Sequence, residues 1–328
     1  MKRLHRQNMM WRVAAGVLAS AWAPIASAQG AYPVKPVRMV AATAAGGQPD
    51  YVARIVAQKL SDFWGKPVVV DNRPGAGGTL AASAVAKATP DGYTLLYVVP
   101  SFVTSEVLQP GLPYDPRKDF VGISQIGFST NIMVAGAGLN VKNAQELIAL
   151  AKAQPGKLIV GSSGIGTASH LVSARFNLSA GIKAVHVAYK SGVEVAVEVL
   201  SGRAHYTVST MSVALPFIRE GKMVGIGVAT PKRSPVLPEV PSLGEIFADF
   251  RQPDTSHNVL APALTPRAIV TQVNRDIARL LDLPDVKSRL NAITFIIAPS
   301  TPQATERQLR EQVEALRRLV REAGLLAK

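Results

Sequence analysis

The chain has 328 residues, no cysteine and a formal net charge of +14 at neutral pH. The absence of cysteine excludes disulfides, thiolate metal sites and a cysteine nucleophile. A basic surplus attracts nucleic acid, anionic membranes or small anions, but the cations are spread along this chain, and near its end arginines alternate with glutamates. This mixture is typical of a solvated helix face and argues against a nucleic-acid-binding stripe.

The first 28 residues have the layout of a secretory signal peptide. Four basic residues without an acid precede an apolar stretch over 13–26, and small residues at 26–28 offer a cleavage site. A membrane anchor is the alternative, but Pro24 interrupts the stretch, which is shorter than the ~20 residues that span a bilayer. Cleavage after Ala28 would leave 300 residues, enough for two domains, and lower the formal charge to +10.

Short apolar runs alternate with helical patterns over the first hundred residues. The strand-like and helix-like segments follow one another at 37–42, 49–64, 67–70, 79–88 and 93–99. The first helix-like segment carries an apolar stripe made of Val52, Ile55, Val56 and Leu60. A β-α-β-α-β order predicts a parallel sheet with right-handed crossovers.

The pattern then restarts, which predicts a second α/β unit. Asn143 and Glu146 match a capping box ahead of a helix. Further strands and helices are predicted in turn at 157–162, 163–181, 184–189, 192–202 and 223–230. Near the C-terminus, Thr265-Pro266 and Thr301-Pro302 each predict an N-cap followed by proline at the first helical position. The predicted fold class is therefore α/β, with a final helical part.

Three glycine-containing turns connect predicted strands to predicted helices, at 43–50, 71–78 (DNRPGAGG) and 161–170. Glycine lets backbone amides approach a ligand, and the unpaired amides at a helix start favour an anion. Ligands of open α/β sheets also gather at the carboxyl ends of strands. The alternative interpretation is that the glycines only make tight turns.

Nucleotide, metal and catalytic motifs are weak or missing. The chain has no phosphate-binding P-loop motif, and the third turn has Ser169 where a dinucleotide fingerprint needs its last glycine. No His, Asp or Glu spacing suits a metal, so neither a metal nor a cofactor is expected. A secreted serine hydrolase using Ser162 or Ser163 with His170 is the alternative function, although the chain lacks a nucleophile elbow and an oriented acid.

Several long motifs occur in the order found in one family. They include GGxxDxxAR at 46–54, GKPVVVDNRPGAGG at 65–78, ATPDGYTLLY at 88–97, GSSGIGTASHL at 161–171 and PKRSPVLPEVPSLGE at 231–245. With these motifs the chain resembles the periplasmic solute receptors of tripartite tricarboxylate transporters, the TctC or Bug family. The resemblance covers essentially all of the chain after the signal peptide.

The resemblance implies a two-domain periplasmic-binding-protein fold of the type II-like flytrap kind, with a hinge and a central cleft. Domain 1 is expected to comprise 29–129 and 255–328, and domain 2 to comprise 130–254. It also implies a monomeric periplasmic receptor without enzymatic activity, which binds a small organic carboxylate and no nucleic acid. The expected partners are the membrane subunits of a tripartite tricarboxylate transporter or a membrane sensor.

The same resemblance implies that the first and third glycine turns hold the carboxylate, partly through backbone amides and ordered water. We expect amide contacts from the glycines, hydroxyl contacts from the third turn and further contacts from the cleft, whereas Asp50 either binds the ligand or braces its own turn. The predicted ligand-binding residues are Ala45, Gly46, Gly47, Asp50, Ser101, Thr104, Ser162, Ser163, Gly164, Gly166, Thr167, His170, Tyr189 and Ser209.

Two departures from the family pattern bear on specificity. Ser209 stands where amino-acid-binding members tend to have an aspartate, and a serine cannot balance an ammonium charge in a closed site. Ser256 stands where many members have a tryptophan, which predicts more room for the ligand. The expected ligand is therefore a mono- or dicarboxylate without a cationic amine, aromatic ligands included.

Overall fold

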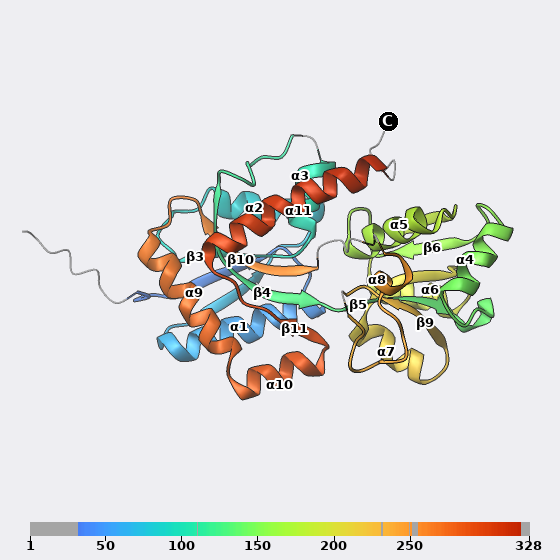
Figure 1. Cartoon of the computed structure of the whole chain (residues 1–328). Coiled ribbons are helices and arrows are strands. Elements are labelled where there is room, and N and C mark those ends of the chain that lie inside the picture. The colour runs from blue at the N-terminus through green and yellow to red at the C-terminus, as the bar shows by residue number, and fades with distance from the viewer. Residues whose placement is uncertain (1–31, 110, 231, 249, 251–254, 323–328) are drawn as a thin grey trace, which may run out of the picture. The chain divides into compact units, whose positions relative to one another are not determined.

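The computed structural model describes residues 32–109, 111–230, 232–248, 250 and 255–322. The predicted signal peptide over 1–28 lies outside the described residues. Within the described part of the chain, none of the helices combines the length and the apolar character that a membrane crossing requires. The described elements form two separate sheets with helices around them (Figure 1).

The first sheet has six strands in the order β11-β4-β10-β3-β1-β2. Its strands are β1 (Val37–Ala41), β2 (Val68–Asn72), β3 (Thr94–Val98), β4 (Phe120–Ser129), β10 (Ser256–Pro262) and β11 (Phe295–Ile297). The three N-terminal strands pair in parallel, as their alternation with helices predicts. Strand β10 runs antiparallel between β3 and β4, so a segment from late in the chain completes the sheet.

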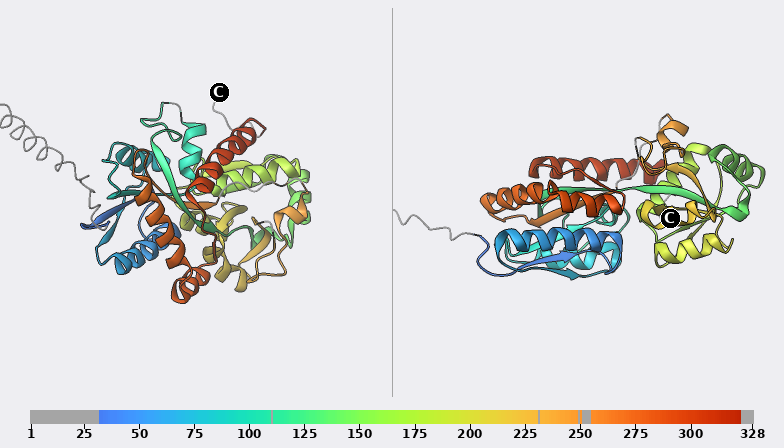
Figure 2. Two further views of the ribbon diagram at one scale, coloured as in Figure 1. Left: turned by 60° about the vertical axis from the view of Figure 1, so that its left-hand side comes forward. Right: turned by 90° about the horizontal axis from the view of Figure 1, so that it is seen from below.

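Six helices of the described residues accompany this sheet. They are α1 (Gln48–Trp64), α2 (Thr79–Ala86), α3 (Ser101–Leu108), α9 (Arg267–Leu281), α10 (Pro284–Ala292) and α11 (Pro302–Glu322). The predicted stripe of α1 is fully buried. Helices α9 and α11 both pack on β4 and contact each other (Figure 2), so the final helical part covers the first sheet.

The second sheet has five strands in the order β7-β6-β8-β5-β9. Its strands are β5 (Asn131–Gly136), β6 (Ile159–Ser162), β7 (Val185–Ala188), β8 (Tyr206–Thr210) and β9 (Met223–Val228). Its helices are α4 (Ala144–Ala153), α5 (Ala168–Ala180), α6 (Gly192–Leu200), α7 (Met211–Arg219) and the short α8 (Leu243–Ile246). A core of its own includes Phe176 and Tyr206, both fully buried.

Two helix starts differ from their sequence prediction. Thr265 does not cap α9, which begins after Pro266, because the buried Thr265 hydroxyl donates to the carbonyl of Pro262 instead. Asn143 does cap α4, because its side-chain oxygen accepts the N–H of Glu146. In a full capping box the Glu146 carboxylate would accept the N–H of Asn143, but here it accepts the N–H of Lys142. The N-cap at Thr301 is confirmed, since its hydroxyl accepts the N–H of Ala304.

A single residue separates the sheets where the chain passes from the first to the second. Strand β4 ends at Ser129 and strand β5 begins at Asn131, so Thr130 alone lies between them. The Thr130 hydroxyl donates to the carbonyl of Thr294, at 2.6 Å, which ties this crossing to the turn before β11. We call Ser129 and Thr130 the strand crossing.

Candidate binding site at the glycine turns

The first glycine turn joins β1 to α1 and is organised around Asp50. This carboxylate is 4% exposed and accepts hydrogen bonds from Gly46 N–H at 2.9 Å, Arg54 Nε at 3.0 Å and Asn72 Nδ2 at 2.9 Å. Burial alone would raise the pKa of Asp50, but these donors outweigh burial and hold it below its ordinary value. Of the two roles expected for Asp50, the geometry favours bracing the turn.

The second turn, DNRPGAGG, supports the first. The Asn72 amide donates to the carbonyl of Thr43 as well as to Asp50, so the end of β2 holds the turn after β1. Gly78 has a φ of +92°, and a Cβ there would lie 3.0 Å from the Cβ of Ala42. Gly77 likewise leaves no room for a side chain, because a Cβ would meet the hydroxyl of Ser105 at 2.7 Å. Close packing explains these glycines without a phosphate.

The third turn joins β6 to α5, and its amides are paired with side chains of the same turn. Gly164 N–H donates to Ser162 Oγ at 3.3 Å, Ser163 N–H to Ser169 Oγ at 3.0 Å, and Gly166 N–H to His170 Nδ1 at 3.0 Å. All three acceptors are neutral groups. A carboxylate is a stronger hydrogen-bond acceptor than these neutral groups.

Two histidines make hydrogen bonds with this turn, His170 with Gly166 and His186 with Ser162. The rings of His170 and His186 stack with their centroids 4.2 Å apart. Burial, and secondarily the neighbouring His186, lowers the pKa of His170 to about 4, and burial also lowers the pKa of His186. Both rings are therefore neutral at pH 7, which leaves His170 Nδ1 able to accept the Gly166 N–H.

The hydrogen bonds do not assemble the serine–histidine pairs of the alternative function. Ser162 Oγ lies 2.7 Å from His186 Nε2, whereas Nδ1 of His170 is occupied by the Gly166 amide. Ser163 Oγ pairs with Ser169 Oγ at 3.0 Å. The predicted pairing of Ser162 or Ser163 with His170 is therefore wrong, because the ring of His170 turns toward its own helix start. Within the described residues, no cluster of His, Asp or Glu suits a metal ion.

Comparison with known proteins identifies the family. Residues 52–325 match the model of the tripartite tricarboxylate transporter family receptor, TctC. The chain belongs to this family. It is similar to protein BugT of Bordetella pertussis, with 30% identity over 89% of this chain and 90% of the relative.

Two solved structures have the same fold. One is R. palustris Rpa4515 with adipate, at a TM-score of 0.82 and 29% identity over 89% of this chain and 98% of that one. The other is MatC from Rhodopseudomonas palustris with bound malate, at a TM-score of 0.75 and 27% identity over 88% of this chain and 100% of that one. The chain thus has the α/β flytrap fold of periplasmic binding proteins, as the resemblance implies.

The remaining predicted residues of this receptor lie around the turns. Ala45, Gly46 and Gly47 are exposed on the first turn, and Tyr189 is tied to the third turn by its N–H, which donates to the Ser162 carbonyl. Ser101 and Thr104 lie on the first turn of α3, and Ser209 lies half-buried near the end of β8. Thr167 caps α5 and donates to the carbonyl of Gly164.

The extra room for a ligand that Ser256 predicts stays a prediction. Ser256 is fully buried on β10, and its hydroxyl accepts hydrogen bonds from Asn258 at 2.8 Å and from Gln312 at 3.3 Å. The hydroxyl therefore takes part in packing between β10 and α11.

Sequence reasoning missed three residues that shape the receptor's turns. Asn72 braces the first turn, while Ser169 and His186 pair with groups of the third turn. Asn72 and Ser169 lie inside the quoted family motifs, and His186 lies inside a further one, HVAYKSG at 186–192. The pairing of His186 with Ser162 carried no sequence signal, since the two residues are 24 positions apart on neighbouring strands.

Replacing Gly166 with alanine should destabilise the receptor by about 2 kcal/mol. Gly166 has a φ of +79°, and a Cβ there would lie 2.5 Å from Cγ2 of Thr104. Urea unfolding measures the loss. Thr104→Ser removes that methyl group, so the double variant Gly166→Ala/Thr104→Ser should regain part of the stability. A double variant no more stable than Gly166→Ala would contradict this contact.

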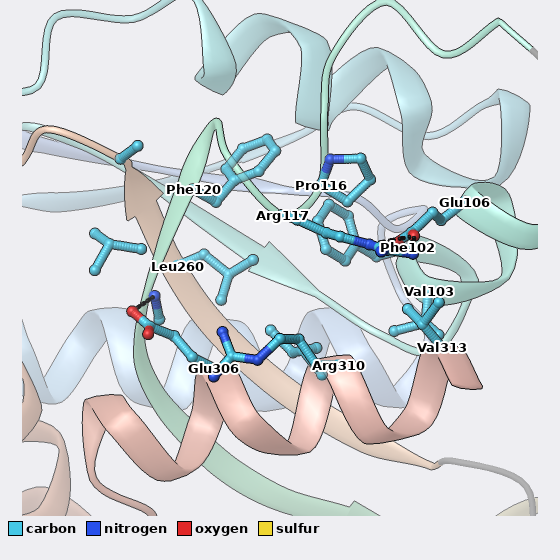
Figure 3. A pocket seen from close by; sticks show the side chains of 14 residues that line it. Phe102, Val103, Glu106, Pro116, Arg117, Phe120, Leu260, Glu306, Arg310 and Val313 are labelled. Carbon is cyan, nitrogen blue, oxygen red and sulfur yellow. Dashed lines mark hydrogen bonds and ion pairs between the residues drawn. The ribbon is translucent and has the colours of Figure 1, made fainter. Parts of the chain in front are cut away.

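A cavity of about 230 Å³ lies among α3, β4 and α11 (Figure 3). Phe102, Phe120 and Leu260 supply apolar walls. Its carboxylates are already paired: Glu106 with Arg117 and Arg317, and Glu306 with the N–H of Gly122 at 3.4 Å. None of the predicted ligand-binding residues lines this cavity.

Proposed function

We propose that this receptor binds a small carboxylate in a cleft between two domains, 29–129 with 255–328 and 130–254, and performs no chemistry on it. The observation that carries the proposal is made at the third turn. The backbone N–H groups of Ser163, Gly164 and Gly166 all donate to neutral side-chain acceptors there. An incoming carboxylate gains charge-assisted hydrogen bonds when it displaces those acceptors. The adipate and malate found with two relatives belong to this chemical class.

The energy required is modest. A micromolar dissociation constant corresponds to about 8 kcal/mol of binding free energy. Hydrogen bonds to a charged group contribute about 1.5–3 kcal/mol each, so a few amides and hydroxyls together with buried carbon suffice. The amides of Gly46, Gly47, Gly164 and Gly166, the hydroxyls of the third turn, and contacts from the remaining predicted residues fill these roles in the proposal.

We further propose that the ligand lacks a cationic amine. Ser209 is half-buried and neutral at the end of β8, beside a sheet end that carries the third turn on β6. An ammonium group enclosed without a counter-charge costs several kcal/mol. Plain mono- and dicarboxylates, aromatic acids included, are therefore the proposed class.

The proposed biological setting follows the family. The signal peptide exports the receptor to the periplasm, where it works as a monomer and delivers its cargo to the membrane subunits of a tripartite tricarboxylate-type transporter. A membrane sensor is the other proposed partner. Co-purification of the tagged receptor with each candidate membrane complex separates the two roles.

Calorimetric titration with matched acids tests the proposal. Glutarate and glutamate differ only by the α-amine, and adipate and malate are the acids found with the relatives. We expect at least one plain acid to bind with a micromolar dissociation constant and to be recovered chemically unchanged. At a hundredfold excess over that constant, the acid should raise the free energy of unfolding by about 2.7 kcal/mol. Glutamate should bind at least a hundredfold more weakly than glutarate. Binding of amino acids alone would refute the proposal, and turnover of esters would favour the hydrolase.

A further inference from the structure

A continuous chain of hydrogen bonds links the first glycine turn to the strand crossing. Tyr97 Oη lies 2.5 Å from His257 Nδ1, and His257 Nε2 lies 2.7 Å from Ser129 Oγ. Ser129 Oγ donates to Gln48 Oε1 at 2.7 Å, and Gln48 Nε2 donates to the carbonyl of Ile293 at 2.8 Å. Gln48 therefore connects Ser129 to Ile293 in a path that joins β3, β10, β4, α1 and the turn before β11.

The proton positions along this path follow from the number of donors. Ser129 has one hydroxyl proton and gives it to Gln48, so His257 must donate to Ser129 from Nε2. Its Nδ1 then accepts the proton of Tyr97. Burial lowers the pKa of His257 to about 3, which agrees with a neutral ring that has one donor and one acceptor. Each group in the path thus has a single consistent role.

Gln48 occupies the one position where this path meets the ligand-binding turn. It is the first residue of α1 and follows Gly47 directly. Its amide contacts both the strand crossing, through Ser129, and the 293–294 turn, which also accepts the Thr130 hydroxyl. A movement of the first turn therefore strains one hydrogen bond to Ser129 in the strand crossing and one to Ile293, in the turn whose Thr294 carbonyl accepts the Thr130 hydroxyl.

We propose that Gln48 is a positioning residue that fixes the first glycine turn relative to the strand crossing, without itself contacting ligand. The side chain does this by holding Ser129 with its oxygen and Ile293 with its nitrogen. Its consequence for carboxylate affinity rests on the proposed function, whereas its effect on the turn does not.

Hydrogen exchange in the ligand-free protein tests the positioning role by itself. Gln48→Met keeps the length of the side chain but removes both hydrogen bonds. We expect amides in 43–51 and 293–297 to exchange at least tenfold faster in this variant than in the wild type. Gln58→Met is the matched control, because Gln58 lies exposed on the same helix and makes only a 3.2 Å surface hydrogen bond with Arg289. Unchanged exchange in both segments would overturn the proposal.

A double-mutant cycle on adipate binding separates positioning from general damage. We expect the dissociation constant to rise about tenfold for Gln48→Met and about fivefold for Ser129→Ala. Because both changes break the same path, the double variant should show about the tenfold rise and not the product of the two. A multiplicative effect would overturn the proposal. If the wild type binds no tested carboxylate, the proposed function fails, and hydrogen exchange alone decides the role of Gln48.

Discussion

Lowering the pH from 7 to 4.5 should reduce the free energy of unfolding by roughly 2.5 kcal/mol through His257 alone. His257 is 1% exposed, and burial lowers its pKa from 6.5 to about 3. In the unfolded chain His257 is protonated as the pH falls below 6.5, whereas in the folded chain it stays neutral until the pH approaches 3. Stability is therefore complete above pH 6.5 and is lost as the pH falls toward the folded pKa. His170, with its pKa of about 4, acts in the same direction.

Urea unfolding at pH 7, 6, 5 and 4.5 measures this dependence. The carboxylate of Asp50, whose pKa is already below its ordinary value, titrates below this window, so the histidines dominate above pH 5. His257→Gln removes the titrating ring and should flatten the curve, even where it lowers stability at pH 7. A wild-type curve that stays level from pH 7 to pH 5, or a folded-state His257 that titrates near pH 6.5 by NMR, would rule out this explanation.

Replacing Asp50 with asparagine should cost about 3 kcal/mol of unfolding free energy at pH 7. One carboxylate oxygen accepts hydrogen bonds from Gly46 and Arg54, and the other accepts one from Asn72. An amide keeps only one acceptor oxygen and places an NH2 group against the donor or donors on the other side. The first glycine turn then loses its brace. Under the proposed function, carboxylate binding should weaken by at least tenfold in the same variant, as measured by calorimetry.

Asp71→Asn is the matched control on the neighbouring strand end. Asp71 pairs with Arg73 at 2.9 Å and Arg38 at 3.9 Å, but its side chain is 31% exposed. Exposed ion pairs contribute at most about 1 kcal/mol, so this variant should remain close to the wild type in both assays. Equal losses in Asp50→Asn and Asp71→Asn would show that burial around Asp50 does not matter.

Part of the candidate binding site could be predicted from the sequence because glycine turns are local signals. The first and third turns follow their strands at the predicted places, and the acids and hydroxyls within them lie close by in the chain. Their hydrogen-bond partners could not be read in the same way. Ser162 pairs with His186 because parallel pairing of β6 and β7 places His186 level with Val160, two positions before Ser162 and therefore on the same face of the sheet.

The sequence by itself determined the elements whose signal lies within a few residues: the apolar stripe of α1, the parallel order of β1 to β3, the cap at Thr301 and the family motifs. The resemblance assigns 255–328 to the first domain, but only the tertiary structure decided that β10 lies antiparallel between β3 and β4, which places His257 beside Tyr97, 160 positions earlier. It also decided that Gln48 reaches both Ser129 and Ile293. The physical reason is that helical periodicity and capping act between near neighbours in the chain. Hydrogen bonds between distant residues exist only after the sheet has set the distance between their backbones.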